Sequence, residues 1–62
     1  MCLSTVYKNE KSPQNIAMSN VQKIDVQDGQ VLLTDLMDRE MVIVGQLLSV
    51  DLVGGVAIVR EA

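Results

Sequence analysis

Cys2 is the one residue of this 62-residue chain that could serve as a soft metal ligand or a strong nucleophile, because the chain has a single cysteine and no histidine. A catalytic cysteine normally needs an adjacent base, most often histidine, to raise its thiolate fraction. We therefore expect no cysteine catalysis and no enzymatic activity. A free cysteine is often an inert, buried hydrophobe, so a purely structural Cys2 stays open as the alternative to a ligand.

The position of Cys2 favours metal binding. Its thiolate neighbours the α-amine of Met1 and its own backbone amide nitrogen, and these donors could hold one ion in fused chelate rings. Nitrogen–sulfur sets favour planar geometry, which suits Ni(II) or Cu(II) better than tetrahedral Zn(II). If Met1 were removed, the α-amine of Cys2 itself would chelate beside the thiolate. One chain cannot supply the four ligands of a structural zinc site, but two N-termini in a dimer could complete a four-coordinate site.

Aspartates near the expected turns offer a second possible cation site, built from oxygen ligands. They are Asp25, Asp28, Asp35 and Asp38. Their spacing does not match an EF-hand loop, and aspartates commonly form turns. We therefore interpret them as turn formers and solvated strand residues. The methionines lack a regular spacing and are typical of core packing.

The charge balance disfavours a nucleic-acid partner. Eight acidic and five basic residues give a net charge of −3, whereas nucleic-acid binders usually carry a basic face. The basic residues are scattered, and Tyr7 is the single aromatic side chain that could stack on a base. The sequence therefore identifies no nucleic-acid-binding residues, which are left as unknown.

The N-terminal segment lacks the basic and apolar regions of a secretory signal. The longest uncharged apolar run, residues 41–50, is too short to span a bilayer. A lone free thiol fits a reducing compartment. We expect no membrane partner and a cytoplasmic location.

The elements that must position these residues are β-strands, because apolar and polar residues alternate and turn signals recur about every 8–12 residues. Strands are expected at residues 2–8, 21–27, 31–36, 41–44, 47–53 and 56–60. Turns are expected at residues 38–39 and, as two-residue hairpins, at Asp28 with Gly29 and Gly54 with Gly55. The polar, proline-containing segment 8–15 predicts a loop, Gly45 predicts a bulge or sharp bend, and residues 16–18 fit either a helical turn or a strand.

These elements predict an all-β fold, a small SH3-like barrel of five to six short antiparallel strands in a single domain of residues 1–62. Val31, Leu33 and Asp35 should share one face of their strand, and Leu48, Val50 and Leu52 one face of theirs. Residues 31–33 and 41–44 are apolar on both faces. A small barrel buries only one of these faces, so we expect a homodimer with an apolar interface. Coverage by loops of the same chain is the alternative.

Several short motifs follow one another along the chain in a distinctive order. They are Met1 with Cys2, the strand 20–26, the turn at Asp28 and Gly29, residues 33–36, residues 44–47 leading to 50–52, and a short turn before a final strand. Over essentially the full chain this order resembles the CooT family of small proteins. The resemblance implies SH3-like barrels that form homodimers. One branch is a nickel-binding accessory to carbon monoxide dehydrogenase maturation, and other members are labelled predicted RNA-binding proteins.

The family cysteine implicated in nickel binding falls on Cys2, whereas Met1 as a donor follows from chemistry alone. The leading prediction is therefore a Ni(II)-binding accessory protein, a metallochaperone for a client metalloenzyme of the carbon monoxide dehydrogenase type. Cu(II) and Zn(II) remain possible metals. The alternative is a small RNA- or protein-binding β-barrel module in which Cys2 is structural.

Overall fold

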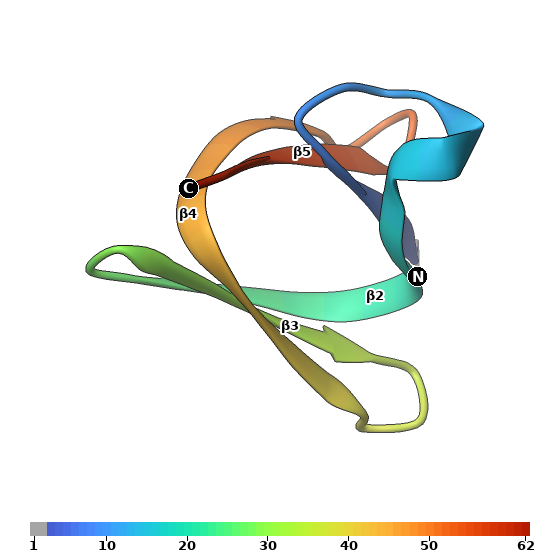
Figure 1. Cartoon of the computed structure of the whole chain (residues 1–62). Coiled ribbons are helices and arrows are strands. Elements are labelled where there is room, and N and C mark those ends of the chain that lie inside the picture. The colour runs from blue at the N-terminus through green and yellow to red at the C-terminus, as the bar shows by residue number, and fades with distance from the viewer. Residues whose placement is uncertain (1–2) are drawn as a thin grey trace.

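The computed structural model describes residues 3–62, which form five β-strands and one short 3-10 helix (Figure 1). In chain order these are β1 (Ser4–Lys8), η1 (Pro13–Asn15), β2 (Ile16–Gln27), β3 (Gln30–Asp35), β4 (Glu40–Asp51) and β5 (Val56–Glu61). The all-β class is therefore confirmed. The expected loop before β2 is confirmed too, and its one helical turn begins at Pro13, where the missing proline N–H costs nothing.

The strands close into a barrel in the order β1-β2-β3-β4-β5. Strands that follow one another in the chain pair antiparallel, as expected for a meander. The closing pair differs, because β1 and β5 run parallel, with Thr5 opposite Val56 and Lys8 opposite Val59. A closed meander with an odd number of strands must contain one such pair, since its first and last strands run in the same direction.

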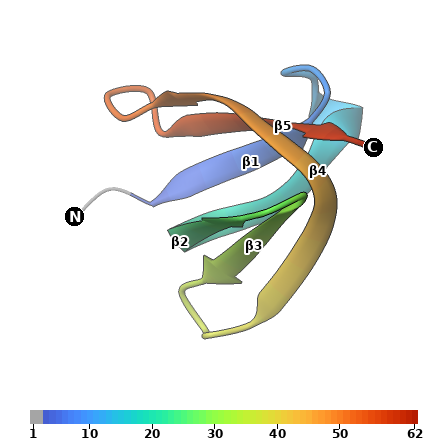
Figure 2. The same cartoon turned by 90° about the vertical axis from the view of Figure 1, so that its left-hand side faces the viewer.

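Two strands are long and bent, although short strands were expected. β2 and β4 have 12 residues each. Each pairs with one neighbour along its first half and with another along its second half, and Figure 2 shows β4 curving from β3 to β5. The strands expected at residues 41–44 and 47–53 are thus one strand. The undecided residues 16–18 belong to β2, which begins at Ile16.

Gly45 makes this long β4 possible. A Cβ atom at this position would overlap the carbonyl oxygen of Arg60, which belongs to β5. The Gly45 N–H also donates to the carbonyl oxygen of Gly29 at 3.0 Å. The bend expected at Gly45 is therefore confirmed, and its physical reason is the close approach of two backbones.

The turn between β4 and β5 is longer than expected. Residues 52–55 form it, whereas Gly54 and Gly55 alone were expected, and β4 ends at Asp51. The Asp51 carboxylate accepts hydrogen bonds from the backbone N–H groups of Val53 and Gly54, at 3.1 and 2.8 Å. An aspartate side chain that mimics a backbone turn in this way ends the strand earlier than apolar alternation predicts.

The hydrophobic core lies inside the barrel. Its buried members are Val6, Val21, Val31, Leu33, Ile43, Ala57 and Val59. The two-residue turn at Asp28 and Gly29 is confirmed, and the ladder that follows it places Val31, Leu33 and Asp35 on the buried face, as alternation predicted.

Many large apolar side chains remain exposed on this small barrel. They are Ile16, Val26, Leu36, Met37, Val42, Val44, Leu48, Val50, Leu52 and Val53. On the outer face of β4, Val42 is 54% and Val44 is 58% exposed. Residues 3–62 therefore do not cover this second apolar face with their own loops.

Candidate functional site

Both expected metal donors, Cys2 and Met1, lie outside the described residues. The strand that follows them, β1, pairs with β2 on one side and with β5 on the other. Ser4 opens β1 opposite Val21 of β2, and the N–H of Thr5 donates to the carbonyl oxygen of Gly55 at 2.9 Å. The described chain therefore starts at the end of the barrel where β1, β2 and the β4–β5 turn meet.

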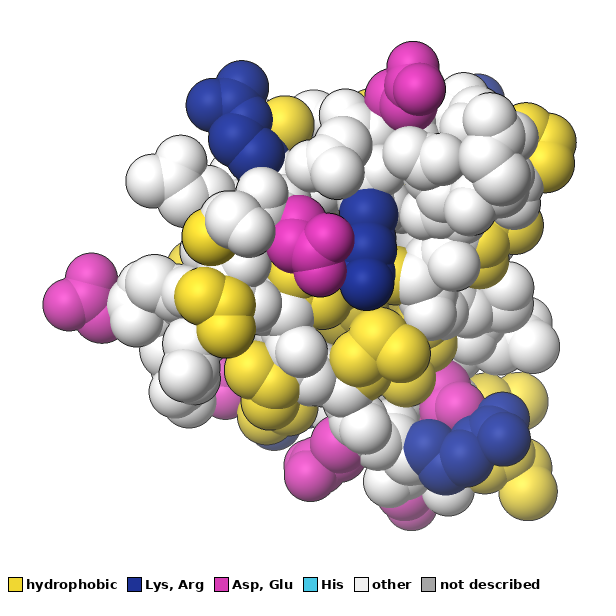
Figure 3. All heavy atoms as spheres, in the orientation of Figure 1, with side chains coloured by type: hydrophobic (Ala, Val, Ile, Leu, Met, Phe, Trp, Pro, Cys, Tyr) yellow, Lys and Arg dark blue, Asp and Glu magenta, His cyan; other side chains and the backbone are white. Residues whose placement is uncertain are grey.

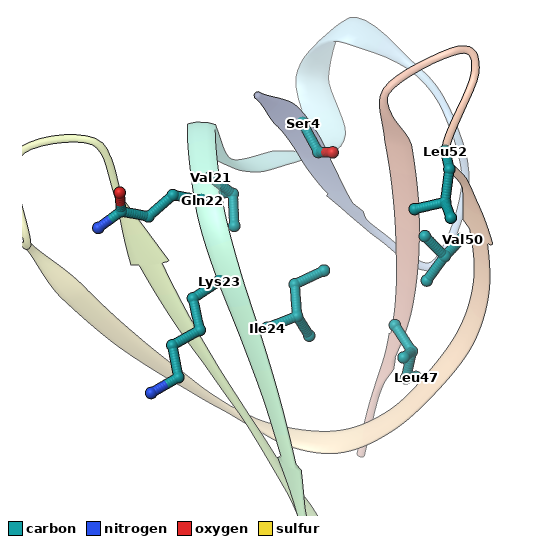
Figure 4. Close-up of a pocket in the computed structure, with 8 residues that line it drawn as sticks. All are labelled: Ser4, Val21, Gln22, Lys23, Ile24, Leu47, Val50 and Leu52. Carbon is teal, nitrogen blue, oxygen red and sulfur yellow. The ribbon is translucent and has the colours of Figure 1, made fainter. Parts of the chain in front are cut away.

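An apolar cleft of about 340 Å³ lies at this end, between β2 and β4 (Figure 4). Its lining includes Ser4, Val21, Ile24, Leu47, Val50 and Leu52. Ile24 faces the space from β2, and Leu47 and Val50 face it from the opposite side. Sequence analysis expected strands at these positions but did not predict that they border a common hollow.

The cleft depends on a bulge in β4. Leu47 lies opposite Val59 and Val50 lies opposite Ala57, with the register shifted at Leu48 between them. Leu47 and Val50 are therefore on the same face as buried core residues. The expected grouping of Leu48 with Val50 on one face is wrong, because a bulged residue reverses the alternation. Strict two-residue periodicity cannot reveal such a shift.

The described residues bring no carboxylate cluster together. Residues 3–62 contain no group of three or more His, Cys, Asp or Glu side chains that could hold a metal ion. The oxygen-ligand site considered for Asp25, Asp28, Asp35 and Asp38 therefore has no structural support.

Asp35 was interpreted as a turn former or a solvated strand residue; the structure supports the turn role, but the residue is buried. The residue is 4% exposed. One carboxylate oxygen, Oδ1, accepts the backbone N–H groups of Met37 and Arg39, both at 2.9 Å, and the other accepts the Arg39 Nε–H at 2.8 Å. Burial by itself raises the pKa of Asp35, but these hydrogen bonds and the Arg39 charge outweigh it and hold the pKa below its ordinary value. Asp35 thus stabilises the β3–β4 turn. The sequence signal for its burial was the two-residue spacing that places it on the same strand face as Val31 and Leu33.

Basic side chains do not gather into one patch on the face drawn in Figure 3. Lys8 pairs with Glu61 at 3.2 Å, and Arg39 pairs with Asp35. On the face drawn in Figure 3, the lysine and arginine side chains lie apart, with acidic side chains between some of them. This distribution differs from the continuous basic face of most nucleic-acid binders.

These features define a small closed β-barrel protein with an apolar cleft beside the start of β1. Within residues 3–62, no helix is long and apolar enough to cross a membrane. A family model described as CO dehydrogenase accessory protein CooT matches residues 1–60, and the chain therefore belongs to the CooT family. A search among curated proteins finds no match to the chain.

Proposed function

We propose that this protein is a non-enzymatic accessory protein that carries Ni(II) as cargo for a carbon monoxide dehydrogenase. The family match over residues 1–60 carries the proposal, because that model describes CO dehydrogenase accessory proteins. Carbon monoxide dehydrogenase is a nickel enzyme. An accessory protein with a soft metal ligand could therefore supply nickel to it.

Cys2 is the proposed thiolate ligand, assisted by nitrogen donors from Met1 and from the Cys2 backbone. Residues 3–62 hold no potential metal-binding cluster, and the chain has no histidine. The donors suited to a borderline-soft ion are thus concentrated near the N-terminus. Nitrogen and sulfur donors favour Ni(II) or Cu(II) over Zn(II). A competition assay measures which of the three ions binds most tightly.

The proposed site is shared across a homodimer, because a second Cys2 thiolate completes the ligand set that one chain lacks. The exposed apolar side chains of the barrel support dimerisation. We also assign residues 1–62 to a single SH3-like domain, on the strength of its small five-stranded meander. A cytoplasmic location suits the free thiol.

The test is a titration with Ni(II) that monitors thiolate-to-nickel charge-transfer absorption in the wild type and in Cys2→Ser. We expect the wild type to saturate at one Ni(II) per two chains and Cys2→Ser to lose the absorption. Affinity should fall as the pH is lowered, because the thiol and the amine must both lose protons to bind. Equal binding by the two proteins would exclude a nickel–thiolate site.

A moved thiol provides the matched control. The double variant Cys2→Ser/Ser4→Cys keeps one cysteine but separates it from the α-amine, so it should bind Ni(II) far more weakly than the wild type. If it binds as tightly, the thiolate matters but the N-terminal chelate does not. Competition with Cu(II) and Zn(II) in the same assay ranks the metals.

A protein-binding module with a structural Cys2 is the second candidate, and the apolar cleft favours it. RNA binding is a weaker form of this alternative, since two basic side chains are already paired with carboxylates. A salt titration distinguishes RNA from nickel. RNA binding weakens steeply with salt because counterions are released, whereas nickel–thiolate binding barely responds.

A further inference from the structure

The first strand, β1, begins beside a longer strand. Ser4, its first residue, lies opposite Val21 of the antiparallel β2, and β2 continues past Val21 to Gln27. A line drawn from β1 toward the N-terminus therefore runs alongside residues 22–27 of β2. Leu3 is the first described residue, so residues 1 and 2 are the part of the chain that comes next along this line.

The alternation of β1 determines which of these two residues belongs to the inner face of the barrel. Val6 is fully buried, and Ser4, two residues earlier, lines the apolar cleft. Successive side chains of a strand point to opposite faces. A continuation of β1 by two residues therefore places Cys2 on the same face as Val6 and Ser4, toward the cleft, and Met1 on the other face.

A bulge in β2 brings Ile24 into line with that position. Relative to β3, β2 has one extra residue between Val21 and Lys23, and an extra residue shifts the alternation. Val21 and Ile24 therefore share the inner face although they are three residues apart, and both line the cleft. In Figure 4, Ile24 points into the cleft and Lys23 points to the other side of β2. Because Ser4 lies beside Val21, the next inward residue of β1 lies beside Ile24.

The cleft at this position suits a cysteine side chain. Its apolar lining residues are Val21, Ile24, Leu47, Val50 and Leu52, and no acidic side chain of residues 3–62 lines it. A free cysteine behaves as a small hydrophobe and is among the most buried residue types. Val50 is 44% and Leu52 is 77% exposed, so an apolar occupant would remove part of their surface from water, which is favourable.

From this geometry we propose that residues 1 and 2 continue β1 along β2, and that the Cys2 side chain occupies the apolar cleft beside Ile24 when no metal is bound. The occupant is this segment because the described chain stops two residues short of it, at the cleft, with a strand phase that directs Cys2 inward. The apolar walls then shield the single thiol of the chain from water and oxidants. The placement rests on the proposed function for the role of Cys2 and adds how this ligand is held before a metal binds.

Disulfide trapping in the metal-free full chain tests this placement. Ile24→Cys adds a second thiol on the cleft face of β2. Residues opposite each other on antiparallel strands have Cα atoms about 4.5–5.5 Å apart, within the range of about 4.4–6.8 Å that a disulfide spans. Oxidised glutathione should therefore convert most of the Ile24→Cys protein to an intramolecular disulfide. Lys23→Cys is the matched control, because its thiol lies one residue away but points to the other face, and its crosslink to Cys2 should form at least about tenfold more slowly.

Mass spectrometry without reductant separates the intramolecular disulfide from crosslinked pairs of chains, and circular dichroism checks that each variant keeps its strands. Alkylation of Cys2 by iodoacetamide gives a second measurement on the unsubstituted chain. At one fixed pH, the folded protein should react at least about tenfold more slowly than the same chain unfolded in urea. A thiol that reacts equally fast in both states, a folded Ile24→Cys that forms no crosslink, or a Lys23→Cys crosslink that forms as fast or faster would each overturn the placement.

The nickel titration of the wild type and Cys2→Ser reads out the proposed function independently, since the trapping and alkylation assays contain no metal. If Ile24→Cys crosslinks as expected while the wild type binds no Ni(II), the placement of Cys2 stands and the metal site is wrong. If Cys2→Ser loses Ni(II) while the wild-type thiol reacts equally fast in the folded and unfolded chain, nickel binding stands and the placement in the cleft is wrong.

Discussion

Asp35 is the residue whose environment is best defined in this barrel, since its buried carboxylate accepts two backbone N–H groups and pairs with Arg39. These contacts satisfy backbone donors at the turn between β3 and β4. They stabilise the ionised form of the side chain, which is why its pKa lies below the ordinary value of an aspartate. The stability that Asp35 contributes is therefore coupled to pH.

We predict that the free energy of unfolding falls as the pH drops below about 4 and that Asp35→Asn removes part of this dependence. A carboxyl with a lowered folded-state pKa contributes stability that is fully present above its unfolded pKa. That stability is lost as the pH falls through the folded pKa. Thermal melts of the two proteins between neutral and acidic pH measure the difference, and Asp35→Asn should also melt at a lower temperature at pH 7.

Asp38→Asn is the matched control, because Asp38 lies in the same turn but is exposed. Its side chain accepts one hydrogen bond from Gln22, and asparagine tolerates the left-handed backbone found there. The control should retain nearly all the wild-type stability. Parallel melting curves for the wild type and Asp35→Asn across this pH range would contradict the assigned role.

Residue types alone could identify Cys2 as the candidate ligand, because the chain has a single thiol and no histidine. The function of Asp35 was not predictable in the same way. Its contacts depend on where Met37 and Arg39 return in the folded turn. The sequence pattern did place Asp35 in phase with Val31 and Leu33, and an aspartate in a core phase is a signal of a satisfied buried carboxylate.

At the scale of elements, Gly45 determines whether β4 can bend across β5. We predict that Gly45→Ala costs about 3–5 kcal/mol, because the added Cβ would collide with the Arg60 backbone. A chain of this size has a total stability of only about 3–9 kcal/mol. The variant should therefore lose a large share of its stability, which thermal or denaturant unfolding followed by circular dichroism measures.

Gly29→Ala controls for the general effect of replacing a glycine. Gly29 also has a positive φ, of 75°, but a Cβ there would meet nothing within 4 Å. Its cost should be only the conformational strain of a left-handed alanine, about 1–2 kcal/mol. Equal destabilisation by the two variants would contradict the close approach as the reason for Gly45.

The pattern of elements was predictable wherever local signals sufficed. The Asp28–Gly29 hairpin and the inward alternation of β3 follow from local turn chemistry and period-two patterning, and both are confirmed. The continuity of β4, its bulge at Leu48 and its end at Asp51 depend on tertiary contacts or on one side-chain hydrogen-bond pattern. Periodicity does not record such contacts, so the cleft beside β2 was not foreseen.

At the scale of the whole molecule, a small core coexists with many exposed apolar side chains. A chain of about 60 residues buries only about 60% of its unfolded surface and is marginally stable alone. The accessible surface is 4180 Å². A standard interface covers about 800 Å² on each partner, so dimerisation would add substantially to the apolar area removed from water.

We therefore predict that the melting temperature depends on protein concentration. When a folded dimer unfolds to two separate chains, mass action favours the dimer at higher concentration, and for chains of this size a tenfold rise should increase Tm by about 5 °C. Differential scanning calorimetry over a hundredfold concentration range measures the slope. A wild-type Tm that stays constant over the range would show that the barrel reaches its stability as a monomer, and that the exposed apolar surface is not covered by a second copy.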